Sequence, residues 1–72
     1  MWVFTFEDTA NQEVYAEPHA DWQTAFEALT SFIDSIRPPV SYASLKTVCE
    51  NIPIGHSTSF SDGAFVFSLA PQ

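Results

Sequence analysis

The sequence is poor in basic residues, glycine and cysteine. Among its 72 residues there are only two cations, Arg37 and Lys46, two glycines and one cysteine, Cys49. Two cations cannot form the basic patch that binds nucleic acid, and two glycines cannot form a phosphate-binding loop. One cysteine excludes an intramolecular disulfide, and two histidines complete only a poor set of zinc ligands. We therefore expect no cofactor and no direct contact with nucleic acid.

Long apolar runs are also missing. No stretch of the sequence approaches the ~20 apolar residues that span a bilayer, and the first residues lack the basic segment of a signal peptide. A lone thiol fits a reducing compartment. These features predict a cytoplasmic protein that does not associate with a membrane.

Aromatic side chains are abundant in this short chain. A chain of 72 residues is near the lower limit for a self-sufficient core, but this one holds seven Phe, two Trp and two Tyr. Each buried aromatic side chain removes roughly 150–250 Å² from water. We expect residues 1–72 to form a single domain with an aromatic core, which dimerisation could supplement.

Alternating apolar and polar residues predict a β-hairpin near the start of the chain. In WVFTFE, residues 2–7, the three aromatic side chains share one face. EVYAE, residues 13–17, alternates as well. A three-residue loop that ends in a left-handed Asn11 would pair Phe6 with Val14.

Helical periodicity is strongest between residues 22 and 37. Asp21 is a candidate N-cap for this helix, and Pro38-Pro39 would end it after Arg37. Its apolar stripe consists of Trp22, Ala25, Phe26, Leu29, Phe32, Ile33 and Ile36. Residues 41–52 fit a shorter second helix, with a strand as the alternative because Tyr, Thr and Val favour sheets.

An Asp-Gly pair predicts a second hairpin between residues 57 and 69. With Asp62-Gly63 at the centre of a type I′ turn, Phe60 would face Phe65. The whole pattern predicts an α+β fold, in which two β-hairpins form a mainly antiparallel four-stranded sheet packed on one long helix, with a second short helix. The helical stripe should be buried against the aromatic residues of the sheet, namely Trp2, Phe4, Phe6, Phe65 and Phe67.

The candidates for catalysis have simpler structural explanations. His19 lies two residues before Asp21, but Asp21 already has a capping role. Cys49 and His56 could form a thiol–imidazole pair, but Cys49 lies on the apolar stripe of the second predicted helix. We expect no enzymatic activity.

The net charge of −7 lies entirely in the first half of the chain. Residues 1–36 hold seven carboxylates and no Lys or Arg, whereas the charges of residues 37–72 cancel. The predicted hairpin places Glu7 opposite Glu13, where like charges repel, so the anionic surface is a candidate for binding a basic partner. The candidate residues are Glu7, Asp8, Glu13, Tyr15, Glu17, Glu27 and Asp34. Two other interpretations of these carboxylates are a solvated surface without a partner and a site for a divalent cation between Glu7 and Glu13.

In size, acidity and layout, the sequence resembles small phage-encoded inhibitors of host defence, a group that includes anti-CRISPR proteins and DNA mimics. The resemblance lies in carboxylates displayed around an aromatic core, without a shared motif. It implies a non-catalytic inhibitor whose carboxylates stand in for phosphates. Such an inhibitor would block a basic, nucleic-acid-binding surface of a target protein in the host cytoplasm. The alternative is a small accessory or structural subunit, homodimeric or part of a larger assembly, whose acidity serves solubility.

Overall fold

Along the chain, a β-hairpin is followed by two helices and then by a second β-hairpin. The structure is a computed structural model that describes residues 1–36 and 42–72. Its elements are β1 (Trp2–Asp8), β2 (Glu13–His19), α1 (Trp22–Ile36), α2 (Tyr42–Glu50), β3 (Thr58–Asp62) and β4 (Phe65–Pro71). Residues Tyr42–Glu50 are therefore helical, and the alternative of a strand in this segment is wrong. The expected stop of α1 at Pro38-Pro39 lies outside the described residues.

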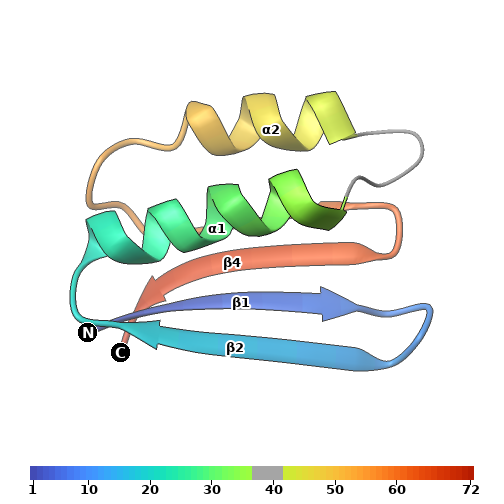
Figure 1. The fold of residues 1–72 in the computed structure, drawn as a ribbon, viewed down its shortest axis with the longest axis horizontal. Helices are drawn as coiled ribbons and strands as arrows, with labels where there is room; N and C mark the ends of the chain where they lie inside the picture. Colours follow the sequence, from blue (N-terminus) through green and yellow to red (C-terminus); the bar gives the residue numbers. More distant parts are fainter. Residues whose placement is uncertain (37–41) are drawn as a thin grey trace.

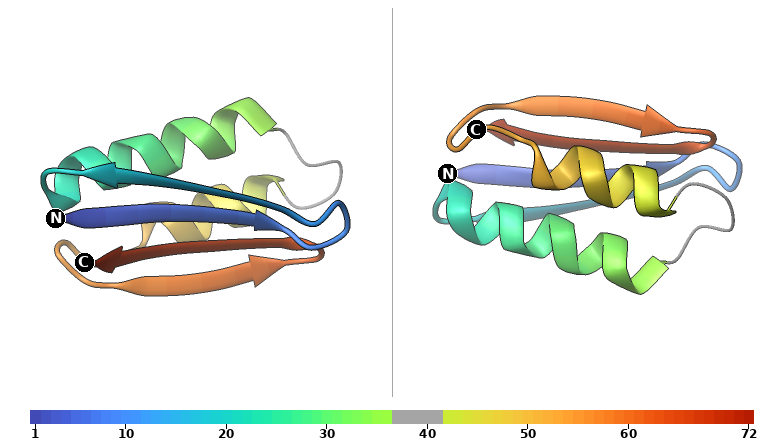
Figure 2. Two further views of the ribbon diagram at one scale, coloured as in Figure 1. Left: turned by 90° about the horizontal axis from the view of Figure 1, so that it is seen from below. Right: turned by 90° about the horizontal axis from the view of Figure 1, so that it is seen from above.

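The four strands form one antiparallel sheet in the order β2-β1-β4-β3. The first and last strands of the chain are therefore neighbours at its centre, and the two chain ends lie at the same edge of the fold (Figure 1). Both helices lie on one face of the sheet, α1 toward β2 and α2 toward β3 (Figure 2). The predicted α+β architecture is confirmed, and within the described residues no helix covers the opposite face.

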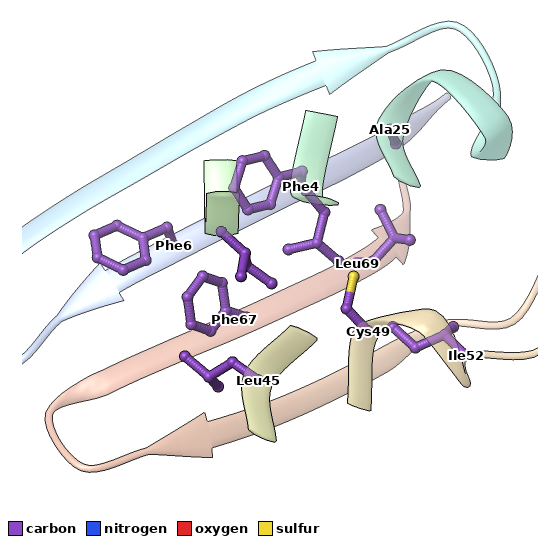
Figure 3. Packing of buried hydrophobic residues seen from close by; sticks show 10 residues of the cluster. Phe4, Phe6, Ala25, Leu45, Cys49, Ile52, Phe67 and Leu69 are labelled. Carbon is purple, nitrogen blue, oxygen red and sulfur yellow. The ribbon is translucent and has the colours of Figure 1, made fainter. Parts of the chain in front are cut away.

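The core lies between the helices and the aromatic face of the sheet (Figure 3). Leu29 and Ile33 of α1 are fully buried, as predicted, whereas Trp22 and Phe26 are partly buried at the margin and stack on each other at 4.9 Å between ring centroids. The side chain of Ile36 lies outside the described part. From the sheet and α2, the buried apolar residues are Phe4, Phe6, Phe67, Leu69, Leu45 and Cys49.

The turn of the second hairpin lies one residue beyond its predicted centre, so each facing pair differs by two residues. Asp62 pairs with Phe65, so the turn residues are Gly63 and Ala64, and Phe60 faces Phe67 instead of Phe65. Gly63 has a φ of 59°, and it is the only residue of this turn with a positive φ, which is the type II′ pattern and not type I′. Because the difference in facing pairs is two residues, every side chain keeps its predicted face.

The first hairpin differs from its predicted register by one residue. Its loop has four residues, 9–12, instead of three, so Phe6 pairs with Tyr15 and not with Val14. The left-handed residue is Gln12, with a φ of 57°, rather than the expected asparagine. A shift of one residue turns every β2 side chain to the opposite face of the sheet.

This shift corrects the predicted anionic face. Glu7 lies opposite Val14 instead of Glu13, and it points to the face without helices. Tyr15 and Glu17 lie on the helix side, across from the aromatic residues of β1. Val14, predicted to point inward, is 69% exposed.

Candidate functional site

Acidic and aromatic side chains alternate along the helix side of edge strand β2. Glu13, Tyr15, Glu17 and His19 occupy every second position of this strand, and so share a face. We call Glu13, Tyr15 and Glu17 the acidic edge. Since β2 has a neighbour on one side only, its outer side is open to a partner.

Tyr15 is held in place by ring contacts. Its ring stacks on Phe32 of α1, with 5.8 Å between the centroids, and meets Phe4 edge-on at 6.1 Å. The side of the ring that faces away from the helix leaves the residue 44% exposed. Tyr15 therefore joins the core to the surface, and its hydroxyl group has a fixed position at the acidic edge.

Both oxygens of Glu17 have neighbours on the same strand, but only Oε2 accepts a hydrogen bond from one of them. The hydroxyl group of Tyr15 donates a hydrogen bond to Oε2 of Glu17, and Nε2 of His19 lies 2.6 Å from Oε1. The bond to this carboxylate raises the pKa of Tyr15 above its ordinary value, because it holds the hydroxyl proton beside a negative charge. Tyr15 and Glu17 are thus held in place before any partner binds.

Glu13 contributes the free carboxylate of the acidic edge. Glu13 is exposed and has no hydrogen-bond or ion-pair partner within the described residues. It faces Asp8 across the hairpin instead of Glu7, so two carboxylates still lie opposite each other. The repulsion is limited because Asp8 is engaged elsewhere.

Asp8 shapes the hairpin loop. It is only 8% exposed, and Oδ1 accepts hydrogen bonds from the backbone amides of Ala10 (3.1 Å) and Asn11 (3.3 Å). Oδ2 accepts a third bond from the side-chain amide of Asn11, at 2.7 Å. These bonds fix the four-residue loop and hence the register. The alternation of the strand gave no sign of this role.

The structure separates the other candidate residues from the acidic edge. Glu7 lies on the opposite face of the sheet. Glu27 is exposed on α1, within 3.5 Å of the side-chain amide of Gln23. Asp34 accepts a hydrogen bond from Nζ of Lys46 at 3.0 Å, which links α1 to α2. The seven candidates therefore do not form one continuous surface, and three of them make the acidic edge.

Asp21 caps helix α1, as the sequence predicts. Its Oδ1 accepts hydrogen bonds from the backbone amide of Thr24 at 2.8 Å and from the hydroxyl group of Thr24 at 2.9 Å. These bonds favour the ionised form and lower the pKa of Asp21. The stabilisation by this cap is present above the ordinary aspartate pKa and is lost as the pH falls through the lowered value.

The thiol of Cys49 is fully buried, whereas His56 is exposed. Burial raises the pKa of Cys49 to about 11. At pH 8 its thiolate fraction is then about two hundredfold below that of an ordinary cysteine. We expect iodoacetamide to modify the native protein at least a hundredfold more slowly than the urea-unfolded protein, as measured by mass spectrometry. Rapid modification of a chain with native circular dichroism would contradict this burial.

Across residues 1–36 and 42–72, no group of three or more His, Cys, Asp or Glu side chains is arranged to hold a metal ion. In the same part of the chain, no helix is long and apolar enough to cross a membrane.

No protein-family model matches the chain, and comparisons with curated proteins and with solved structures find no significant match.

Proposed function

We propose that the protein is a non-catalytic binding module whose acidic edge docks on a basic protein surface. The observation that carries this proposal is the acidic edge on an open edge strand, where Tyr15 and Glu17 are held by a hydrogen bond and Glu13 is free. No Lys or Arg occurs in residues 1–36 to neutralise it. Complementary charge would speed association with a basic target and fix its orientation.

The chemistry of the acidic edge suits a surface that normally binds nucleic acid. Carboxylates can take the place of phosphates against Lys and Arg, and an exposed tyrosine ring can stack on a guanidinium group. This supports the resemblance to phage-encoded inhibitors of host defence, including anti-CRISPR proteins, which act in the host cytoplasm. The target would be a basic protein of a nucleic-acid-binding complex.

The test removes two charges from the acidic edge. In Glu13→Gln/Glu17→Gln, shape is largely retained, and we expect association with a basic protein captured from a bacterial lysate to slow by about tenfold at low salt. The matched control is Glu7→Gln/Glu50→Gln, which removes the same charge from the opposite sheet face and from α2. Surface plasmon resonance at two salt concentrations would compare both variants with the wild type.

Two results would contradict the proposal. Equal losses in both double variants would mean that total charge matters and the acidic edge does not. Unchanged binding together with aggregation of the edge variant would mean that these glutamates only prevent edge-to-edge pairing of strands, with the help of Pro18 in the same strand.

A second candidate function is that of an accessory or structural subunit of a larger assembly. It is favoured by the sheet face that carries no helix (Figure 2), because a bare face with few charges suits an interface better than a solvated surface. In this case the acidity of the other surfaces would serve solubility.

A further inference from the structure

The face of the sheet opposite the helices is nearly free of charge. We call it the open face. Its apolar side chains are Val3, Val14, Ala16, Pro18, Val66 and Ala70. The remaining positions are held by four small hydroxyl side chains and by one carboxylate, Glu7. Solvated faces of antiparallel sheets usually carry polar and charged side chains, so this composition is unusual for a surface in water.

The exposed fractions show that residues 1–36 and 42–72 leave this face uncovered. Val14 is 69% exposed, and Ala16, Pro18 and Ala70 are exposed as well. On the central strands, Val3 and Val66 keep part of their surface accessible. In the view from below in Figure 2, the strands lie in front of α2, on the side away from the helices.

We propose that the open face binds the open face of a second copy of this chain, forming a symmetric dimer with the two sheets packed together. This inference deepens the second candidate function and does not depend on the acidic edge. Each copy carries a charge of −7, so two copies repel through most of their surfaces. The open face holds one of the nine carboxylates, and it is where two copies approach with least repulsion.

The size of the face fits a weak but specific dimer. Three strands have seven residues and β3 has five. At about 3.3 Å per residue and 4.8 Å between strands, the sheet covers on the order of 400 Å². Because a pleated surface is larger than its projection, two faces would bury about 1,000 Å² together, near the lower limit of specific interfaces. Small side chains would let the sheets approach to about 10 Å.

Electrostatics predict an unusual salt dependence. Salt screens the repulsion between two acidic copies, so dimerisation should strengthen as salt increases. Binding of the acidic edge to a basic partner should weaken under the same change. The two interactions can therefore succeed or fail separately in experiments on the same protein.

The test is sedimentation equilibrium of the full chain from ~10 μM to 1 mM, at about 0.05 and 0.5 M NaCl. We expect a monomer–dimer equilibrium that tightens with salt. Ser68→Lys, in the middle of the open face, should weaken the dimer by at least about tenfold, although it reduces the net charge and thus the general repulsion. The control Ser31→Lys makes the same exchange on the exposed surface of α1 and should leave the dimer intact.

A second variant tests the same face in case Ser68→Lys does not fold. Ala16→Lys places the charge on the same face but on edge strand β2, and circular dichroism would check that both variants stay folded. A wild type that stays monomeric at both salt concentrations would overturn the proposal, and would leave the face to another protein or to solvent. Dimers that persist in both folded lysine variants would overturn it too.

Discussion

Leu29→Ala is expected to destabilise the fold by about 3 kcal/mol, within the range measured for buried leucines. Leu29 lies at the middle of α1, is fully inaccessible to solvent and belongs to the hydrophobic core cluster. Truncation would remove its contacts with the aromatic face of the sheet and leave a cavity. A domain of this size is stabilised by only about 5–10 kcal/mol, so the loss should be visible as a lower urea midpoint.

The matched control for this prediction is Ile54→Ala. Ile54 is 85% exposed in the loop after α2, so the same kind of truncation should change the unfolding free energy by less than about 0.5 kcal/mol. If Leu29→Ala unfolds at the same urea concentration as the wild type, α1 packs through a different face.

Gly63→Val is expected to cost about 1–3 kcal/mol, the usual range for a strained backbone conformation. Gly63 has a φ of 59°, which a β-branched side chain resists. A Cβ atom at this position would meet nothing within 4 Å. The cost therefore comes from the backbone and not from a steric clash, and thermal unfolding would measure it.

The neighbouring turn residue provides the control. Ala64 has no positive φ, so Ala64→Val should be tolerated much better than Gly63→Val. Equal effects of the two substitutions would contradict the type II′ turn. If Asp62→Val destabilises the protein strongly and Gly63→Val only weakly, the turn is not centred on Gly63 and Ala64.

Much of the fold could be predicted because its strongest signals are local. The apolar stripe through Leu29 and Ile33 keeps the helical spacing of 3.6 residues over about four turns, and both residues are buried as expected. In the second hairpin, the predicted facing pairs were wrong by two residues, but Phe67 and Leu69 were still placed correctly inward. Alternation fixes the face of a strand more firmly than it fixes its partner.

The first hairpin could not be predicted from alternation alone. Its register depends on the three hydrogen bonds that Asp8 accepts from Ala10 and Asn11, which stabilise a loop of four residues. The stacking of Tyr15 on Phe32 also favours the observed face, since it gives an aromatic ring of β2 a contact with α1. Neither contact has a signal in the residue pattern of the strands.

The candidate site was predicted in composition but not in arrangement. The sequence shows that the first half of the chain is acidic. It does not show that Lys46 reaches Asp34 from another helix, or that Tyr15 and Glu17 lie on the helix side of the sheet. The contact of Lys46 with Asp34 joins two helices, so it follows from the tertiary structure alone. The neighbours of Glu17 are two residues away on the same strand, and alternation places them on its face in either register.

The central structural claim is the register of β1 against β2, which cross-strand NOEs between backbone protons would test most directly. This register places the acidic edge on the helix side and leaves the open face with one carboxylate. We expect NOEs between Thr5 and Ala16 and between Val3 and Pro18, together with contacts between the rings of Tyr15 and Phe32. NOEs that pair Thr5 with Tyr15 would return Tyr15 to the opposite face, and would contradict both the acidic edge and the open face.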